Sequence, residues 1–66
     1  MKNKLKVERA KLNLTQQELA DKIGVSRQTI NSIEADRYVP STILAIKISN
    51  VFKTTVNDIF LIEDDE

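Results

Sequence analysis

An all-α fold of five short helices is predicted for this chain from three features of its sequence. The 66 residues include one Gly and one Pro, which argues against both a turn-rich β structure and disorder. Cys and His are absent, so neither a disulfide framework nor a zinc site of those ligands can stabilise the fold. The 41% of hydrophobic residues must therefore form the core, in short helices that begin at polar capping residues.

The first two helices are predicted from spacing and from one capping pattern. Lys4–Leu12 lacks Gly and Pro and has helical spacing of its inward residues. Thr15 and Glu18 have the Thr-x-x-Glu spacing of a capping box, which opens a helix over Gln16–Ile23. Gly24 ends this helix, because the residue after a helix often takes a positive φ that glycine tolerates best.

The third helix is predicted to begin after a turn of about three residues. Ser26 can cap a helix that runs from Arg27 to Ala35. Pro40 disfavours helical geometry in the residue before it, so residues 36–40 are expected to form a loop.

The C-terminal third of the chain is predicted to contain two helices and an extended end. Ser41 caps a helix over Thr42–Phe52. Thr55 opens a short helix over Val56–Phe60. Residues 60–62 are apolar and are expected to be extended.

The second and third helices indicate the function. Two short helices joined by a short turn with a Gly describe a helix-turn-helix, in which Ala20 provides the small residue at the crossing and Gly24 the turn. At about 100° per residue, Ile30 and Ile33 define the buried side of the third helix. The opposite face carries Gln28, Asn31, Ser32 and Ala35, flanked by Arg27 and Thr29.

This exposed face is rich in amides and hydroxyls, whereas a merely solvated helix usually carries Glu–Lys pairs. Gln or Asn can pair bidentately with adenine in the DNA major groove, and Arg can pair with guanine. Taken alone, Gln28 and Asn31 are equally compatible with solvated polar residues. Within the helix-turn-helix, contact with DNA is the favoured interpretation.

The distribution of charge is consistent with a nucleic-acid partner. The net charge is zero, but Glu63–Glu66 is acidic, and the other 62 residues carry 10 basic against 6 acidic side chains, a net charge of +4. We therefore expect a DNA-binding domain over residues 1–62 and an acidic tail over residues 63–66.

Four segments together resemble a known family: Thr15-Gln16-Gln17-Glu18-Leu19-Ala20, Gly24-Val25-Ser26, Ile30-Asn31-Ser32-Ile33-Glu34 and Pro40-Ser41. They resemble the Cro/C1-type (XRE) helix-turn-helix family, particularly its short single-domain repressors, over residues 4–60. The resemblance implies a compact five-helix, lambda-repressor-like domain. Asp36 departs from the pattern, since many relatives have Gly there, but Asp can adopt the left-handed conformation at some cost.

The resemblance also implies roles for individual residues. A second-helix Gln, here Gln16, would touch a phosphate and lie against the recognition helix. Relatives pair a first-helix Arg with the Glu that ends the recognition helix, here Arg9 and Glu34. Residues implied to approach bases or phosphates are Ser26, Arg27, Gln28, Asn31 and Ser32, with Arg37, Tyr38 and Ser41 meeting the flanking backbone. Whether Arg27 meets a base or a phosphate, and whether Tyr38 packs or binds, stays open.

The sequence thus predicts a sequence-specific DNA-binding transcriptional regulator, with a repressor favoured. The alternatives are a DNA-binding antitoxin or phage regulator and, in another class, a protein–protein adaptor, which should expose an apolar face on the third helix. An enzyme is not expected, since no catalytic pair or phosphate-cradling Gly loop is present. Double-stranded DNA is the expected partner, without cofactor, metal or membrane, and a cytoplasmic location is expected because no signal peptide or run of 18 apolar residues occurs.

A homodimer is expected, because one recognition helix touches too few base pairs to single out a site in a genome. Two copies would place their recognition helices about 34 Å apart on a near-palindromic operator. Val56, Leu61 and Ile62 are apolar residues that the five-helix core does not clearly use, and they are assigned to the interface. The shortest relatives pair their two terminal segments as a small sheet, so Phe60–Ile62 is expected to lie alongside Met1–Asn3.

Overall fold

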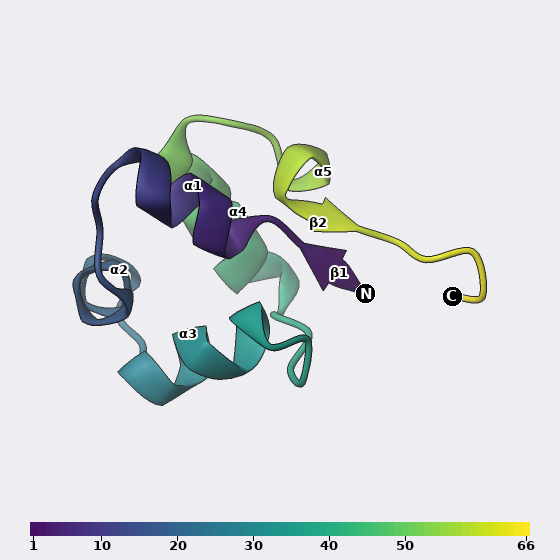
Figure 1. Cartoon of the computed structure of the whole chain (residues 1–66), viewed down its shortest axis with the longest axis horizontal. Coiled ribbons are helices and arrows are strands. Elements are labelled where there is room, and N and C mark those ends of the chain that lie inside the picture. Colours follow the sequence, from purple (N-terminus) through teal and green to yellow (C-terminus); the bar gives the residue numbers. More distant parts are fainter.

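The computed structural model describes residues 1–66 and contains five α-helices and one two-stranded antiparallel sheet, as the sequence predicted (Figure 1). In chain order the elements are β1 (Lys2–Asn3), α1 (Leu5–Lys11), α2 (Gln16–Ile23), α3 (Arg27–Glu34), α4 (Thr42–Phe52), α5 (Val56–Ile59) and β2 (Phe60–Leu61). The bounds of α2 and α4 match those predicted. The others are shorter: α1 loses one residue at each end, Ala35 is the C-cap of α3, and Phe60 leaves α5 to enter β2.

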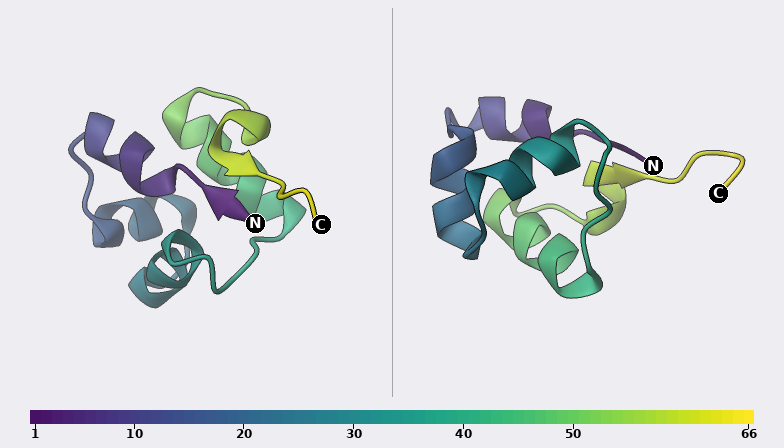
Figure 2. Two further views of the ribbon diagram at one scale, coloured as in Figure 1. Left: turned by 45° about the vertical axis from the view of Figure 1, so that its right-hand side comes forward. Right: turned by 90° about the horizontal axis from the view of Figure 1, so that it is seen from below.

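One apolar core joins all five helices and β2. Its 11 buried residues are Leu5, Leu19, Ala20, Ile23, Ile30, Ile33, Leu44, Ala45, Ile48, Ile59 and Phe60. The most extensive contact between helices is that of α2 with α3, which cross one another on one side of the molecule (Figure 2). The longest helix, α4, has 11 residues, and none of the five has the length and apolar character needed to cross a bilayer.

Hydroxyl side chains cap four of the five helices. Thr15, Ser26, Ser41 and Thr55 each accept the backbone N–H of the residue three positions later. At α2 the capping box is complete, because the carboxylate of Glu18 also accepts the N–H of Thr15 at 2.9 Å. This bond to the backbone N–H holds the pKa of Glu18 below its usual range. The carboxylate therefore stays ionised, and the capping box intact, to a lower pH than an unbonded Glu would allow.

Left-handed residues end two helices and begin the loop after α3. Gly24 caps α2 with φ of 78°, and its N–H donates to the carbonyl oxygen of Ala20 at 2.9 Å. Lys53 caps α4 with φ of 53°. Asp36 has φ of 61°, so this residue adopts the strained left-handed conformation that its position requires.

The small sheet brings the two ends of the chain together. Lys2 pairs with Leu61 and Asn3 with Phe60, as expected, whereas Ile62 lies outside the paired residues. The N–H of Lys4 extends the contact by donating to the carbonyl oxygen of Ile59 at 2.8 Å. Beyond β2 the acidic segment runs away from the helices, and α3 lies on another side of the body (Figure 1).

Gly24 is expected to stabilise the turn through its backbone conformation alone. A Cβ at this position would meet no atom within 4 Å, so Gly24→Ala should lower the free energy of unfolding by about 1 kcal/mol through left-handed strain. Lys53→Gly removes comparable strain and should raise the free energy of unfolding by up to about 1 kcal/mol. Urea denaturation followed by circular dichroism measures both changes, and shifts of the same sign would contradict this explanation.

Candidate nucleic-acid interface

The turn between α2 and α3 sets the angle at which α3 is presented. The carbonyl oxygen of Ala20 accepts the N–H groups of both Gly24 and Val25, at 2.9 and 3.0 Å. The methyl group of Ala20 is fully buried, so α3 can approach closely. Ile30 and Ile33 fix the inner face of α3 in the core. Its polar face is therefore left outward, beside α2.

A shallow groove of about 290 Å³ follows this outward face and the loop after it. It is lined by Ser26, Gln28, Thr29, Ser32, Arg37 and Tyr38. The structure thus brings together five residues that the sequence assigned to DNA. Thr29 is an addition, since the helical-wheel argument placed it only at the flank of the face. The sequence could have indicated Thr29, because it lies three residues before Ser32 and therefore about one helical turn away on the same edge of α3.

The other assigned residues lie around this groove, and some have structural bonds. Arg27 is exposed on α3. Asn31 is half-buried, and its Oδ1 accepts from Nη2 of Arg37 at 3.2 Å. Ser41 is exposed on the far side of the loop, where its hydroxyl is used to cap α4 by accepting the N–H of Leu44 at 3.2 Å.

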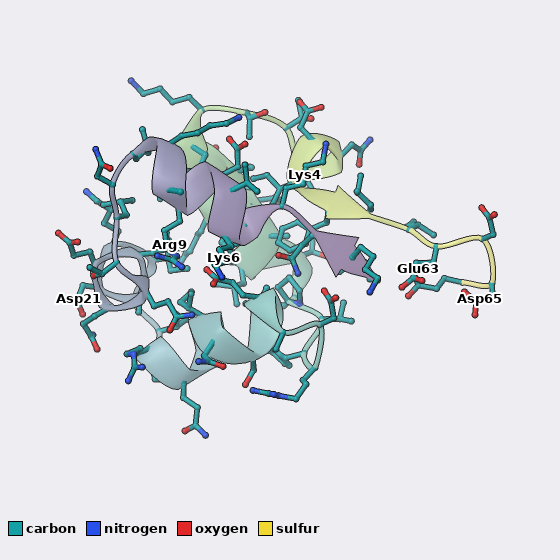
Figure 3. All side chains as sticks on the ribbon, viewed as in Figure 1. Lys4, Lys6, Arg9, Asp21, Glu63 and Asp65 are labelled. Atoms are coloured by element: carbon teal, nitrogen blue, oxygen red, sulfur yellow. The ribbon has the colours of Figure 1, made fainter.

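An ion pair fixes α3 to the other helices. Nε of Arg9 donates to Oε2 of Glu34 at 2.8 Å, and Nη2 donates to Oε1 at 3.1 Å. Nη1 of Arg9 donates to the carbonyl oxygen of Leu14 at 2.8 Å, and Nε2 of Gln16 donates to Oε1 of Glu34 at 3.1 Å. Figure 3 shows Arg9 reaching from α1 into the space between the helices. The hydrogen bonds to Glu34 raise the pKa of Arg9, so the guanidinium stays charged.

Asn3 is a residue of this region that the sequence analysis missed. Its Nδ2 donates to the carbonyl oxygen of Ile33 at 2.7 Å and to Oδ1 of Asp36 at 2.9 Å. Nζ of Lys2 lies 3.5 Å from the other carboxylate oxygen of Asp36. The N-terminal strand therefore holds the end of the recognition helix. No motif signals this role, because the contact spans 30 residues of sequence.

The apolar residues assigned to a dimer interface lie on the side of the terminal sheet. Leu61 is 39% exposed and Ile62 is 79% exposed. Val56 is half-buried and packs against the core, so the core uses it in part. Val56 also lines an apolar groove of about 210 Å³, together with Met1, Val39, Pro40, Thr42, Ala45 and Phe60. On α4, Ile43 and Ile46 are large apolar residues that the sequence analysis did not assign, and they are 70% and 48% exposed.

Comparison with known proteins identifies the family. A family model described as Helix-turn-helix, HTH_3, matches residues 5–59. The chain belongs to this helix-turn-helix family. Its resemblance to XRE-type regulators is thereby confirmed, with the helix pair at the centre of the matched region.

Relatives in the helix-turn-helix family match most or all of the chain. The uncharacterised HTH-type transcriptional regulator MJ0272 of Methanocaldococcus jannaschii is 59% identical over 66 residues, which cover 100% of both chains. YgzD of Bacillus subtilis, another uncharacterised HTH-type transcriptional regulator, is 43% identical over 98% of both. A solved structure, the clp gene regulator ClgR of Corynebacterium glutamicum, has a TM-score of 0.75 at 28% identity, covering 82% of this chain and 57% of ClgR.

Removing the carboxylate of Glu34 should destabilise the fold because it leaves Arg9 partly buried without a counter-charge. The two side chains are 8% and 15% exposed, so Glu34→Gln is expected to cost about 2–3 kcal/mol of unfolding free energy, somewhat less than for a fully buried pair. Replacing both residues by Met should cost less than the sum of the two single replacements. Chemical denaturation of wild type, Arg9→Met, Glu34→Met and the double variant provides the cycle, and strictly additive losses would show that the pair is not coupled.

Proposed function

We propose that this protein is a sequence-specific DNA-binding regulator that represses transcription as a homodimer. The observation that carries the proposal is the polar groove along the outward face of α3, which a helix-turn-helix presents at the surface. An α-helix fits the width of the B-DNA major groove, and amides, hydroxyls and Arg are the groups that pair with base edges there. Repression would follow from occupying a promoter.

The groups on this face divide by chemistry into base-reading and backbone-binding sets. Gln28 is exposed at the groove and offers both a donor and an acceptor, which matches adenine. Ser26 is at the N-terminus of α3, where backbone N–H groups favour an anion such as phosphate. Tyr38 is 46% exposed at the other end of the groove, which leaves its ring accessible to the DNA backbone. We assign Gln16, Arg27 and Ser41 to the phosphates on either side.

The adaptor alternative predicts an apolar face in place of this groove. The large exposed hydrophobic residues are Val7, Leu12, Tyr38, Val39, Ile43, Ile46, Leu61 and Ile62. Of these, Tyr38 lines the groove and no other does. A polar recognition face with the apolar surface elsewhere favours DNA over a protein partner at α3.

We infer that the acidic tail does not oppose DNA binding. Glu63 and Asp65 lie on the segment that extends beyond the sheet, away from α3 (Figure 3). The remaining 62 residues have a net charge of +4. Residues 1–62 are therefore proposed to be the DNA-binding domain, with residues 63–66 as a tail outside the interface.

The apolar groove beside the sheet is proposed to be covered by a second copy. The loop that leaves the recognition unit contributes Val39 to this groove, and the terminal region contributes Phe60. Leu61 and Ile62 follow in sequence and are exposed, as is Ile43 on α4. Pairing through this surface would bury apolar area that water now contacts, and two recognition helices would double the length of DNA that is read.

Gln28→Ala is expected to test the reading face directly. If Gln28 pairs bidentately with a base, the change should cost about 1–3 kcal/mol of binding free energy on the preferred site and relax preference at one base pair per half-site. Nζ of Lys11, on α1, donates to Oε2 of Glu8 at 2.8 Å, so Lys11→Ala should change the binding free energy little. Fluorescence anisotropy with selected and mismatched duplexes gives the two affinities. Equal losses on all sequences for both variants would refute the assigned face.

Leu61→Asp is expected to convert the dimer to a monomer, because a carboxylate would be buried at the interface without a partner. Leu12→Asp provides a matched control, since Leu12 is the C-cap of α1, is 51% exposed and does not line the apolar groove. Sedimentation velocity at micromolar concentration should show a dimer for wild type and for Leu12→Asp, and a monomer for Leu61→Asp. A monomeric wild type that binds a full palindrome without cooperativity would contradict the proposed assembly.

A further inference from the structure

Two residues implicated separately in DNA contact are bonded to each other in the structure. Nη2 of Arg37 donates to Oδ1 of Asn31 at 3.2 Å, which joins the loop after α3 to the helix itself. Asn31 is half-buried on α3, while Arg37 is exposed and lines the groove beside Gln28. The bond therefore lies at the surface proposed to face the bases.

The course of the backbone directs Arg37 back toward α3. Its N–H donates to the carbonyl oxygen of Ser32 at 2.9 Å, which folds the loop over the last turn of the helix. Asp36, just before it, has the left-handed φ of 61° that this reversal needs. The carboxylate of Asp36 is held from the N-terminal strand by Asn3 at 2.9 Å and Lys2 at 3.5 Å. The position of Arg37 is thus fixed by the last turn of α3 and, through Asp36, by the N-terminal strand.

The bond changes what Asn31 can present to a base. An isolated Asn offers an acceptor and a donor, the pair that recognises N6 and N7 of adenine. With Arg37 donating to the carbonyl oxygen, the amide N–H groups of Asn31 and the remaining N–H groups of the guanidinium have no partner within the chain. The free groups of Asn31 and Arg37 together are therefore hydrogen-bond donors. In the major groove, guanine is the base that presents two adjacent acceptors, N7 and O6.

We propose that Asn31 and Arg37 act as one hydrogen-bond-donor unit that selects guanine at one base pair of each half-site. The inference rests on the proposed DNA-binding function and adds to it a specific base and a residue outside α3 that determines the choice. Asn3, through Asp36, is a positioning residue for this unit.

Selection from a random duplex pool tests the unit with the full-length protein. Wild type should select guanine at the base pair where Asn31→Ala relaxes preference, and Arg37→Ala should relax preference at the same base pair. Discrimination between guanine and adenine there should fall by about 5- to 100-fold in either variant. Arg27→Ala removes the same charge from an exposed arginine on α3 and should keep the guanine.

A double-mutant cycle separates the unit from two independent contacts. On the selected duplex, Asn31→Ala and Arg37→Ala together should cost little more than either alone, because each breaks the same unit. A duplex with adenine at that position provides the reference. On it, the loss of affinity caused by Asn31→Ala or by Arg37→Ala should exceed the loss caused by Arg27→Ala by no more than about threefold. Circular dichroism melts should show all the variants folded.

Selection of adenine at this position by wild type would overturn the inference. So would an Arg37→Ala variant that weakens every duplex equally and reduces the salt dependence, because this is the behaviour of a phosphate contact. Either result leaves the DNA-binding function in place. A wild type that binds without any sequence preference would instead overturn the proposed sequence-specific function, and this inference with it.

Discussion

The ion pair between Arg9 and Glu34 is the contact on which the position of the recognition helix depends. It joins α1 to the last residue of α3, and the same two side chains reach the loop before α2 through Leu14 and the start of α2 through Gln16. Apolar packing alone permits helices to slide over one another, whereas bidentate bonds have a fixed geometry. The helix-turn-helix is therefore held at its outer edge by polar bonds and at its inner face by the core.

Much of the fold could be predicted because its determinants are local. The capping residues Thr15, Ser26, Ser41 and Thr55 each lie within three residues of the bond they make, so the starts of four helices were readable from the sequence. The end of α5 was less predictable. Phe60 has helical spacing after Val56, but pairing with Asn3 draws it into the sheet, and that pairing depends on residues at the opposite end of the chain.

The candidate site was predictable where it depends on local sequence spacing, as the helices were. Helical periodicity separated Ile30 and Ile33 from the polar face that includes Gln28, and the structure agrees with that separation. The anchoring of Asp36 by Asn3 and the bond between Arg37 and Asn31 could not be read from any spacing. They depend on how a loop folds back against a strand and a helix, and periodicity carries no information on such contacts.

The shortness of the helices has a consequence for how the protein exists in solution. They contain between 4 and 11 residues, whereas isolated helices below about 12–15 residues are marginal in water. No helix, including α3, can persist apart from the others, and the only sheet consists of two residues from each end of the chain. The protein is therefore not expected to unfold in part and keep a free recognition helix. Release of the N-terminal strand would remove the bonds that Lys2 and Asn3 make to the end of α3 and to Asp36.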